Sequence, residues 1–250
     1  MAGTTIPGRL SWVLAEVAEI IVETPRTRTL VLAVPGWAGH RPGQHVDIRL
    51  TAEDGYQAQR SYSIASAPDG DRIQLTVERL DDGEVSPYLA GELRVGDPVE
   101  LRGPIGGYFA WDILDGGPLL LISGGSGVAP LMAMIRHRAA AGSHIPTRLL
   151  YSSRSFEEIL YREELERLAS ADGTLEVIHT LTRAQPADWT GYSRRIDRAM
   201  LAEVAWPPSQ RPLVYICGPT RLVESVAATL VGLGHEPARI KTERFGPTGG

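Results

Sequence analysis

The sequence predicts a two-domain protein, with an N-terminal antiparallel β-barrel followed by an α/β domain built on a parallel sheet. Three observations indicate this class. The first half contains short strand-like runs separated by turn residues, as in small barrels. The second half alternates buried strand-like runs with helical patterns, as in parallel sheets. The rhythm changes near Trp111, so we expect domains at residues 1–113 and 114–250, joined by a linker at 112–117.

Each expected strand of the barrel is bounded by turn residues, such as Pro42-Gly43 and Asp69-Gly70. The strand-like runs cover residues 12–23, 29–35, 45–50, 59–66, 73–80 and 98–104, and a short helical pattern covers 86–93. In the second domain, strands are expected at 118–123, 148–153, 175–181, 213–218 and 239–245, and helices at 128–141, 156–170, 195–205 and 220–233. The continuously apolar run at 118–123 is typical of a strand buried on both faces.

Composition limits the class of protein. With 43% hydrophobic and 22% charged residues, the 250-residue chain is expected to form a sizeable core rather than stay disordered. No apolar run approaches the length of about 20 residues that a membrane span needs, and no secretory signal is expected. Residues 1–113 carry a net charge of −6 and residues 114–250 one of +1, and the acidic first half argues against a nucleic-acid partner.

Cysteine and histidine usage argues against metal chemistry. The single cysteine, Cys217, excludes an internal disulfide and a four-cysteine metal or iron–sulfur site. The six histidines have no recognisable ligand spacing, so no metal site is expected. A cytoplasmic location follows as the default.

The segment "LLLISGGSGVAP" at 119–130 is a strand, a glycine turn and the start of a helix. Glycines let backbone N–H groups approach a pyrophosphate, and the helix N-terminus favours negative charge. Gly125 and Gly127 fill the first two glycine positions of the dinucleotide fingerprint, whereas Pro130 takes the third. We therefore predict that Gly125, Ser126, Gly127 and Pro130 bind a dinucleotide. The alternative is a tight strand-to-helix turn without a ligand.

Hydroxyl and guanidinium groups gather where an NAD site would carry an acid. The second strand of the domain ends in Ser153 and Arg154, and the third ends in Thr182 and Arg183. These groups suit a 2′-phosphate, so NADPH is favoured, although NADH stays open. A further cluster contains Tyr192, Arg194 and Arg195, and a solvated helix start is the alternative for the two arginines.

Five segments in order resemble the ferredoxin–NADP reductase family, over about residues 10 to 245. They are "RSYS" at 60–63, "GEVS" at 83–86, "GPIGGYF" at 103–109, "GGSGVAP" at 124–130 and "CGP" at 217–219. The resemblance implies a flavin-binding barrel, a nicotinamide-nucleotide domain, and an active site in the cleft between them.

The resemblance gives the "RSYS" strand the role of a flavin cradle. Arg60 would pair with a flavin phosphate, Tyr62 would stack on the isoalloxazine ring, and Ser63 would hydrogen-bond near N5 of the flavin. Ile64, the next residue, is included in the cradle. The alternative is an ordinary edge strand with a solvated arginine.

The "GEVS" turn would bind the pyrophosphate of FAD. Gly83 would leave room for it, the amides of Val85 and Ser86 begin the short helix, and the Ser86 hydroxyl could donate. This favours FAD over FMN, which has a single phosphate. The alternative is a plain helix N-cap at Ser86.

The C-terminal part would supply the nicotinamide side of the site. The motif here is Cys217, Gly218 and Pro219. In the family, its cysteine packs near the nicotinamide without a covalent bond. Glu243 and Phe245 have the spacing of an acid and an aromatic residue that end plant-type members. Phe245 would then cover the other flavin face, and Glu243 would handle a proton near Ser63 and Cys217. Five residues follow Phe245, which departs from the pattern and leaves the role of this tail open.

The resemblance thus implies an NAD(P)H-dependent, FAD-containing oxidoreductase with Ser63, Cys217 and Glu243 as its catalytic residues. The chain length leaves no room for a fused redox domain, so a separate acceptor is expected: a ferredoxin, an oxygenase component or another redox enzyme. A free-flavin reductase, an electron-transfer subunit of a larger complex and a flavin-free NADP-binding regulator are the alternatives. The sequence names neither the acceptor nor the oligomeric state.

Overall fold

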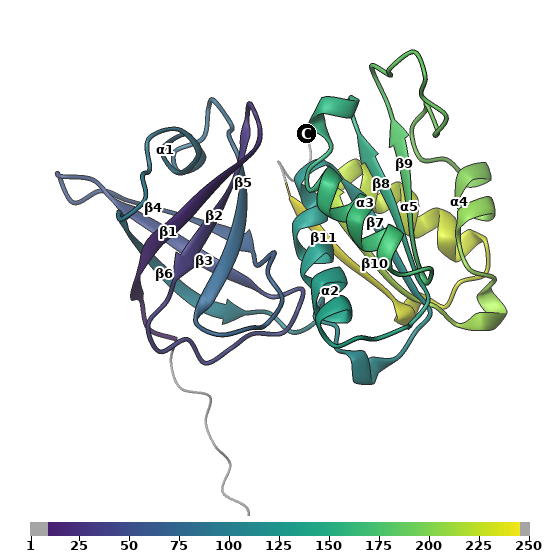
Figure 1. Ribbon diagram of the computed structural model, residues 1–250, viewed down its shortest axis with the longest axis horizontal. Coiled ribbons are helices and arrows are strands. Elements are labelled where there is room, and N and C mark those ends of the chain that lie inside the picture. The colour runs from purple at the N-terminus through teal and green to yellow at the C-terminus, as the bar shows by residue number, and fades with distance from the viewer. Residues whose placement is uncertain (1–9, 246–250) are drawn as a thin grey trace, which may run out of the picture.

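The computed structural model describes residues 10–245, which form two domains side by side (Figure 1). The first domain is an antiparallel sheet with the strand order β4-β3-β6-β1-β2-β5. The sheet curls until its edge strands meet, where Ile64 bridges to Leu75, so it is the predicted barrel. Its strands are β1 (Val13–Thr24), β2 (Thr27–Ala33), β3 (His45–Thr51), β4 (Gln57–Ser63), β5 (Arg72–Glu78) and β6 (Pro98–Ile105).

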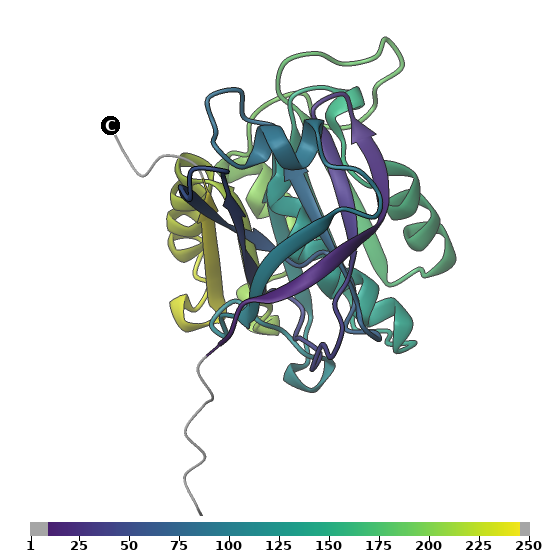
Figure 2. The ribbon, with the colours of Figure 1, turned by 90° about the vertical axis from the view of Figure 1, so that its left-hand side faces the viewer.

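The barrel is filled by alternate residues of its strands, because successive side chains point to opposite faces. On β5, Ile73, Leu75 and Val77 are all buried, and the helix α1 (Ser86–Gly91) adds Leu89 to the same cluster. The helix closes one end of the barrel (Figure 2). The 3-10 turn η1 (Ile113–Asp115) lies in the link to the second domain.

The second domain is a parallel sheet with the order β11-β10-β7-β8-β9. Alternate residues of β7 enter separate cores: Leu119 and Leu121 pack with α2 and α3, and Leu120 and Ile122 pack with α4 and α5. Helices therefore cover both faces, as predicted. The strands are β7 (Leu119–Gly124), β8 (Thr147–Ser153), β9 (Leu175–Leu181), β10 (Leu213–Pro219) and β11 (Ile240–Phe245). The helices are α2 (Val128–Ala140), α3 (Arg162–Ala171), α4 (Arg198–Val204) and α5 (Thr220–Gly232), with 3-10 turns η2 (Gly125–Gly127), η3 (Phe156–Glu158), η4 (Pro208–Gln210) and η5 (Pro237–Arg239).

Two helix starts differ from the prediction. The helix expected at 156–170 begins only at Arg162, because Tyr161 takes a left-handed conformation with φ of 55° that no α-helix continues through. The helix expected at 195–205 begins at Arg198, because the Asp197 side chain accepts the Met200 N–H at 2.8 Å and caps the helix there. The strand expected at 59–66 ends at Ser63.

Polar side chains join the two domains. The Tyr161 hydroxyl hydrogen-bonds the Thr76 hydroxyl on β5, and the Tyr161 N–H donates to Glu23 Oε2 on β1 at 3.3 Å. From α2, Arg136 donates to the Ala65 carbonyl at 2.8 Å and to Gln74 Oε1 on β5 at 2.7 Å. These contacts fix how the barrel faces the parallel sheet. The exact boundary at residues 113 and 114 stays a prediction, since the sheets end at Ile105 and begin at Leu119. No helix within residues 10–245 is long and apolar enough to cross a membrane.

Candidate active site at the domain junction

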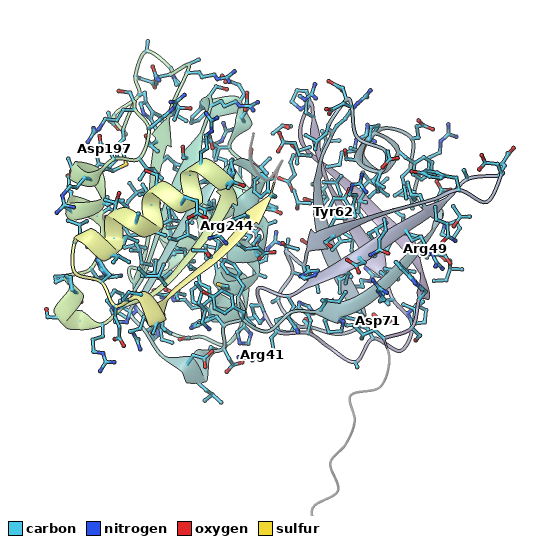
Figure 3. All side chains as sticks on the ribbon, turned by 180° about the vertical axis from the view of Figure 1, so that it is seen from behind. Arg41, Arg49, Tyr62, Asp71, Asp197 and Arg244 are labelled. Atoms are coloured by element: carbon cyan, nitrogen blue, oxygen red, sulfur yellow. The ribbon has the colours of Figure 1, made fainter. Side chains whose placement is uncertain are left out.

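Strand β4 carries the expected flavin cradle. Arg60 and Tyr62 are two residues apart, so both point to the same face of the strand. Tyr62 is half-buried on the part of the barrel nearest the second domain (Figure 3), and burial raises the pKa of its hydroxyl to about 12. A neutral, partly sheltered ring is what a flat ligand needs for stacking.

The turn after β5, which is predicted to bind the pyrophosphate of FAD, requires glycine at position 83. A Cβ on Gly83 would lie 2.9 Å from Ser86 Oγ and 3.1 Å from the Leu80 carbonyl, so the turn needs glycine. The helix N-cap is Val85, and Ser86 Oγ accepts the Leu80 N–H at 3.0 Å instead of capping the helix. The interpretation of Ser86 as a plain N-cap is therefore wrong, and its hydroxyl proton stays available to a ligand.

An acid without a predicted role occupies the middle of this turn. Glu84 pairs with Arg60 at 2.7 Å and accepts the Tyr56 hydroxyl at 2.6 Å. Hydrogen bonds from Tyr56 and Arg60 hold the pKa of the Glu84 carboxyl below its usual value, so it is charged at neutral pH. The guanidinium expected to bind phosphate thus already has an anionic partner in this structure.

The nucleotide loop lies between β7 and α2. Gly125 has φ of 56°, a conformation that favours glycine, and a Cβ on Gly127 would collide with the Cys217 carbonyl. Pro130 is buried in the first turn of α2, where a missing N–H costs no hydrogen bond. Ser126 points to the barrel and donates to Glu78 Oε2 at 2.9 Å. No acidic residue lies in the first turn of α2 itself, so the loop presents a helix N-terminus suited to an anion.

Three side chains stand in a row beside this loop. Ser123 on β7, Cys217 on β10 and Glu243 on β11 occupy matching positions on adjacent strands and therefore share one face of the sheet. Ser63 of the barrel donates to Glu243 Oε1 at 3.5 Å, so the row meets the flavin cradle at the domain junction. The structure thus brings the three predicted catalytic residues together.

Burial sets the protonation of this row. It raises the pKa of Glu243 to about 7, while the hydrogen bond from Ser63 acts in the opposite direction. Burial, with a smaller effect of the Glu243 carboxylate, raises the pKa of the Cys217 thiol well above its usual value. The cysteine is therefore a neutral thiol at physiological pH, whereas Glu243 is poised to take or give a proton.

Two polar atoms of the row are left unpaired. Glu243 Oε2 and Ser123 Oγ are buried and have no hydrogen-bond partner within residues 10–245. Buried polar groups are normally paired, so unpaired ones on either side of Cys217 mark a place where a ligand or water completes the structure. Among the described residues, no group of three His, Cys, Asp or Glu side chains is placed to hold a metal ion.

The residues expected to select the coenzyme lie at the ends of β8 and β9. The Arg183 N–H donates to the Arg154 carbonyl at 2.9 Å, and Thr182 Oγ1 donates to the Ser153 carbonyl at 3.2 Å. Both guanidiniums are exposed, and within residues 10–245 neither forms an ion pair. They are free to bind a phosphate.

Tyr192 and Arg194 are differently engaged. Arg194 pairs with Asp197 at 2.7 Å and lies over the Tyr192 ring, and its carbonyl accepts the Thr180 hydroxyl. These contacts fit the solvated helix start that was the alternative for this cluster. Of the cationic side chains predicted to bind the coenzyme, Arg154 and Arg183 are the ones with no competing carboxylate.

The C-terminal strand brings the remaining predicted residues to the same edge. Phe245 pairs in register with Pro219, next to Gly218, and its side chain is 38% exposed. The aromatic ring is thus available at the end of β11 where the strand meets the junction. The five residues after Phe245 lie outside the described residues, and so does any role of this tail.

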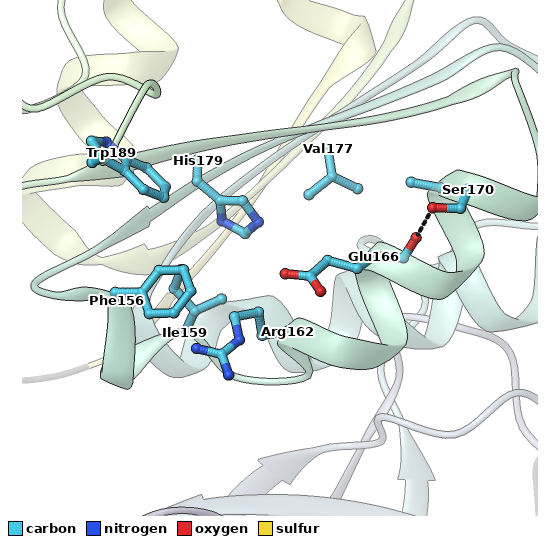
Figure 4. Close-up of a pocket in the computed structure, with 9 residues that line it drawn as sticks. Phe156, Ile159, Arg162, Glu166, Ser170, Val177, His179 and Trp189 are labelled. Atoms are coloured by element: carbon cyan, nitrogen blue, oxygen red, sulfur yellow. Dashed lines mark hydrogen bonds between the residues drawn. The ribbon is translucent and has the colours of Figure 1, made fainter. Parts of the chain in front are cut away.

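A separate hollow of about 250 Å³ lies between α3 and β9 (Figure 4). Its walls include Phe156, Trp189 and His179, and burial lowers the pKa of His179 to about 4. None of the residues predicted to bind flavin or coenzyme lines this hollow, and the residues that carry the expected chemistry meet at the domain junction instead.

Comparisons with known proteins agree with this geometry. Residues 15–110 match the family model described as "Oxidoreductase FAD-binding domain", and residues 121–228 match "Oxidoreductase NAD-binding domain". The chain is 35% identical to ferredoxin–NADP reductase B of Sorangium cellulosum over 211 residues, which is 81% of this chain and 84% of that protein.

Two further proteins extend the similarity. The glycine betaine monooxygenase reductase subunit of Pseudomonas aeruginosa is 32% identical over 243 residues, 94% of this chain, and the chain spans only 64% of its length. The FAD/NAD-binding domain of nitric oxide dioxygenase from Vibrio cholerae superposes with a TM-score of 0.84 at 29% identity, covering 94% of this chain and 99% of that one.

Proposed function

Because the chain belongs to the ferredoxin–NADP reductase-like family of FAD- and NAD(P)-dependent oxidoreductases, we propose that it transfers electrons from NADPH to a separate acceptor protein. FAD supplies chemistry that no side chain has, since it accepts a hydride and can release electrons singly. The observation that supports this proposal most directly is the row of Ser123, Cys217 and Glu243, which meets Ser63 of the barrel at the junction of the two domains.

The two cofactors would be held by opposite sides of the junction. On the barrel, Arg60 is a guanidinium within reach of the Gly83 turn, and Tyr62 offers a partly sheltered ring. On the second domain, the backbone of the loop at 125–127 would bind the coenzyme pyrophosphate. The residues proposed to bind flavin are Arg60, Tyr62, Ser63, Ile64, Gly83, Val85, Ser86 and Phe245, and those proposed to bind the coenzyme are Gly125, Ser126, Gly127, Pro130, Ser153, Arg154, Thr182, Arg183, Tyr192, Arg194, Cys217, Gly218 and Pro219.

The catalytic side chains would orient the reactants and manage protons. Cys217 stays protonated and uncharged, so it can pack against a nicotinamide ring without reacting with it. Glu243, with a pKa of about 7, can hold a proton on Oε2 or release it near neutral pH. Ser63 donates to Glu243 Oε1, which couples this acid to the flavin cradle.

NADPH is the proposed coenzyme. Arg154 and Arg183 are exposed, joined through the backbone, and free of ion pairs within residues 10–245, which suits the 2′-phosphate of NADPH. NADH is the second candidate, because Glu157 and Glu158 lie close behind Arg154 in the chain and would repel that phosphate.

The acceptor is proposed to be a ferredoxin or an oxygenase component. The single cysteine cannot ligate an iron–sulfur cluster by itself, and a ferredoxin or oxygenase component would supply the next redox centre. The similarity to a reductase subunit of a monooxygenase favours a partner of this kind. A cytoplasmic location stays a prediction.

One observation favours a second function, the reduction of free flavin. Arg60 already pairs with Glu84, so flavin phosphate must compete for it, and a bound flavin could exchange more readily. Gel filtration of the reconstituted protein separates the two functions. A reductase with a resident cofactor keeps FAD through the column, whereas a flavin reductase elutes without it.

The test of the proposed function is an anaerobic assay of the purified protein. Bound flavin should absorb near about 450 nm, and NADPH should bleach this band within one turnover. Addition of an oxidised ferredoxin or oxygenase component should restore the band. The proposal would be contradicted if the protein binds no flavin after reconstitution. It would also be contradicted if neither NADPH nor NADH reduces the bound flavin.

A further inference from the structure

Glu78 is a barrel residue that touches the nucleotide loop of the other domain. It is the last residue of β5, and its Oε2 accepts the hydroxyl proton of Ser126 at 2.9 Å. Both residues are half-buried, so the contact is partly sheltered from solvent and from salt. No local sequence pattern links the two residues, which are 48 positions apart.

The loop that Glu78 touches is built for an anion. The N-terminus of α2 has no side-chain cap and no acidic residue in its first turn, so its first backbone N–H groups lack side-chain partners, and Gly125 before it takes a φ of 56° that favours glycine. Glu78 therefore places a carboxylate of the barrel next to the N-terminus of α2, the end of the helix that is suited to an anion. Its position is one that a phosphate of the coenzyme would approach.

We propose that Glu78 is an affinity-determining residue that weakens coenzyme binding and speeds its exchange. This inference rests on the proposed function, because it requires a dinucleotide at the loop. The Ser126 hydroxyl has a single proton, which cannot serve Glu78 and a phosphate oxygen together. Whether or not a pyrophosphate at the loop breaks the Glu78–Ser126 hydrogen bond, its negative charge lies near the negative carboxylate of Glu78.

The Glu78 carboxylate therefore competes with a coenzyme phosphate for the Ser126 hydroxyl. Repulsion between a carboxylate and a phosphate raises the free energy of the complex and not that of the separate partners. Among related complexes, such losses are found chiefly in faster dissociation. The structure assigns Glu78 to release of the oxidised coenzyme after each hydride transfer.

The experiment compares coenzyme binding by the FAD-loaded wild type and Glu78→Gln. Glutamine has nearly the same shape, and its carbonyl oxygen can still accept from Ser126, so the variant removes charge and little else. Binding of NADP⁺ and NAD⁺ to the oxidised protein is titrated calorimetrically at low and high ionic strength. Asp71→Asn is the matched control, since Asp71 is an exposed acid immediately before β5, whose opposite end carries Glu78.

Glu78→Gln should bind NADP⁺ about three- to tenfold more tightly than the wild type at low salt, and the gain should shrink at high salt. Asp71→Asn should match the wild type, and Glu78→Ala, which frees Ser126, should also bind more tightly. Equal affinity of Glu78→Gln and the wild type, or weaker binding by the variant, would overturn the inference while leaving the proposed function intact. Failure of the wild type to bind either nucleotide would overturn both.

Discussion

Ser63 on the barrel and Glu243 on the last strand of the sheet share a hydrogen bond of 3.5 Å across the domain junction. They are 180 residues apart in the chain, and the bond links the proposed flavin cradle to the buried acid beside Cys217. A change in the barrel at Ser63 should therefore alter the pKa of Glu243 in the second domain.

Glu243 should make stability depend on pH. Its pKa is raised from 4.5 to about 7 in the folded protein, so its contribution to stability is complete below pH 4.5 and is lost as the pH rises through 7. Relative to Glu243→Gln, the wild type should lose up to about 3 kcal/mol of unfolding free energy between these limits. Urea unfolding of both proteins between pH 4.5 and 8 measures this difference.

The control for Glu243 is Ser63→Ala. The hydrogen bond from Ser63 lowers the pKa of Glu243, so its loss should move the midpoint of the pH dependence upward. A difference curve between wild type and Glu243→Gln that stays flat from pH 4.5 to 8 would show that Glu243 titrates at its ordinary value.

Cys217→Ala should slow reduction of the flavin by NADPH by roughly ten- to hundredfold and leave FAD bound. The backbone of Cys217 packs directly against Gly127 of the loop, and the thiol is proposed to position the nicotinamide, where small displacements of reacting atoms are costly in rate. Anaerobic stopped-flow reduction measures the effect, with Ser225→Ala on the exposed face of α5 as the control. An unchanged rate would make Cys217 a packing residue.

Glu84→Gln should raise the affinity of the apoprotein for FAD by about three- to tenfold at low ionic strength. The substitution removes the charge that competes with flavin phosphates for Arg60. Quenching of FAD fluorescence on titration with apoprotein gives the dissociation constant, and Glu53→Gln, an exposed acid of the same domain, corrects for net charge. Weaker binding by Glu84→Gln would mean that Glu84 shapes the phosphate turn and does not compete for Arg60.

Arg183→Ala should raise the KM for NADPH by about tenfold or more and leave the KM for NADH nearly unchanged. The reason is that each charge-assisted contact to a 2′-phosphate, which NADH lacks, contributes about 1.5–3 kcal/mol. Steady-state kinetics with both coenzymes test this, and Arg167→Ala on α3 serves as an exposed arginine control. A wild type that uses NADH as well as NADPH would assign Arg183 to another anion.

Tyr161→Phe should destabilise the junction by about 1–2 kcal/mol, since the buried Thr76 hydroxyl loses a partner. Thr76 keeps its contact with Thr29, at 2.8 Å, which limits the loss. Thermal unfolding measures it, and Tyr88→Phe on the barrel surface is the control. Equal unfolding midpoints for Tyr161→Phe and the wild type would remove this hydrogen bond from the contacts that hold the domains together.

The order of strands and helices could be predicted because it depends on local patterns of apolar residues and turn residues in the sequence. The run at 118–122 is apolar without interruption, and β7 is buried on both faces. The helix start at Arg162 could not be predicted, since Tyr161 follows no local rule: its left-handed conformation accompanies contacts with Glu23 and Thr76 on the barrel. Tertiary contacts outweighed the helical pattern at 156–161.

The site was predictable only where a motif lies in one segment. Arg60, Tyr62 and Ser63 belong to one strand, so the family resemblance places them together. The partners of these motifs were missed for different reasons. Ser123 was visible as a polar residue at the end of an apolar strand, and Glu84 lies inside the "GEVS" turn. Glu78 had no such signal, because its contact with Ser126 exists only when the two domains meet.

The pairing of β11 with β10 has a consequence for how the protein is made. At about 5–20 residues per second, the stretch between Ser63 and Glu243 takes roughly 10–40 s to translate, and the barrel leaves the ribosome well before the last strand. During that interval a nascent chain can carry the flavin cradle and the glycine loop without the buried acid. A chain that is still being translated therefore lacks the Ser63–Glu243 contact, and the junction between the two domains is complete only after residue 243 has been made.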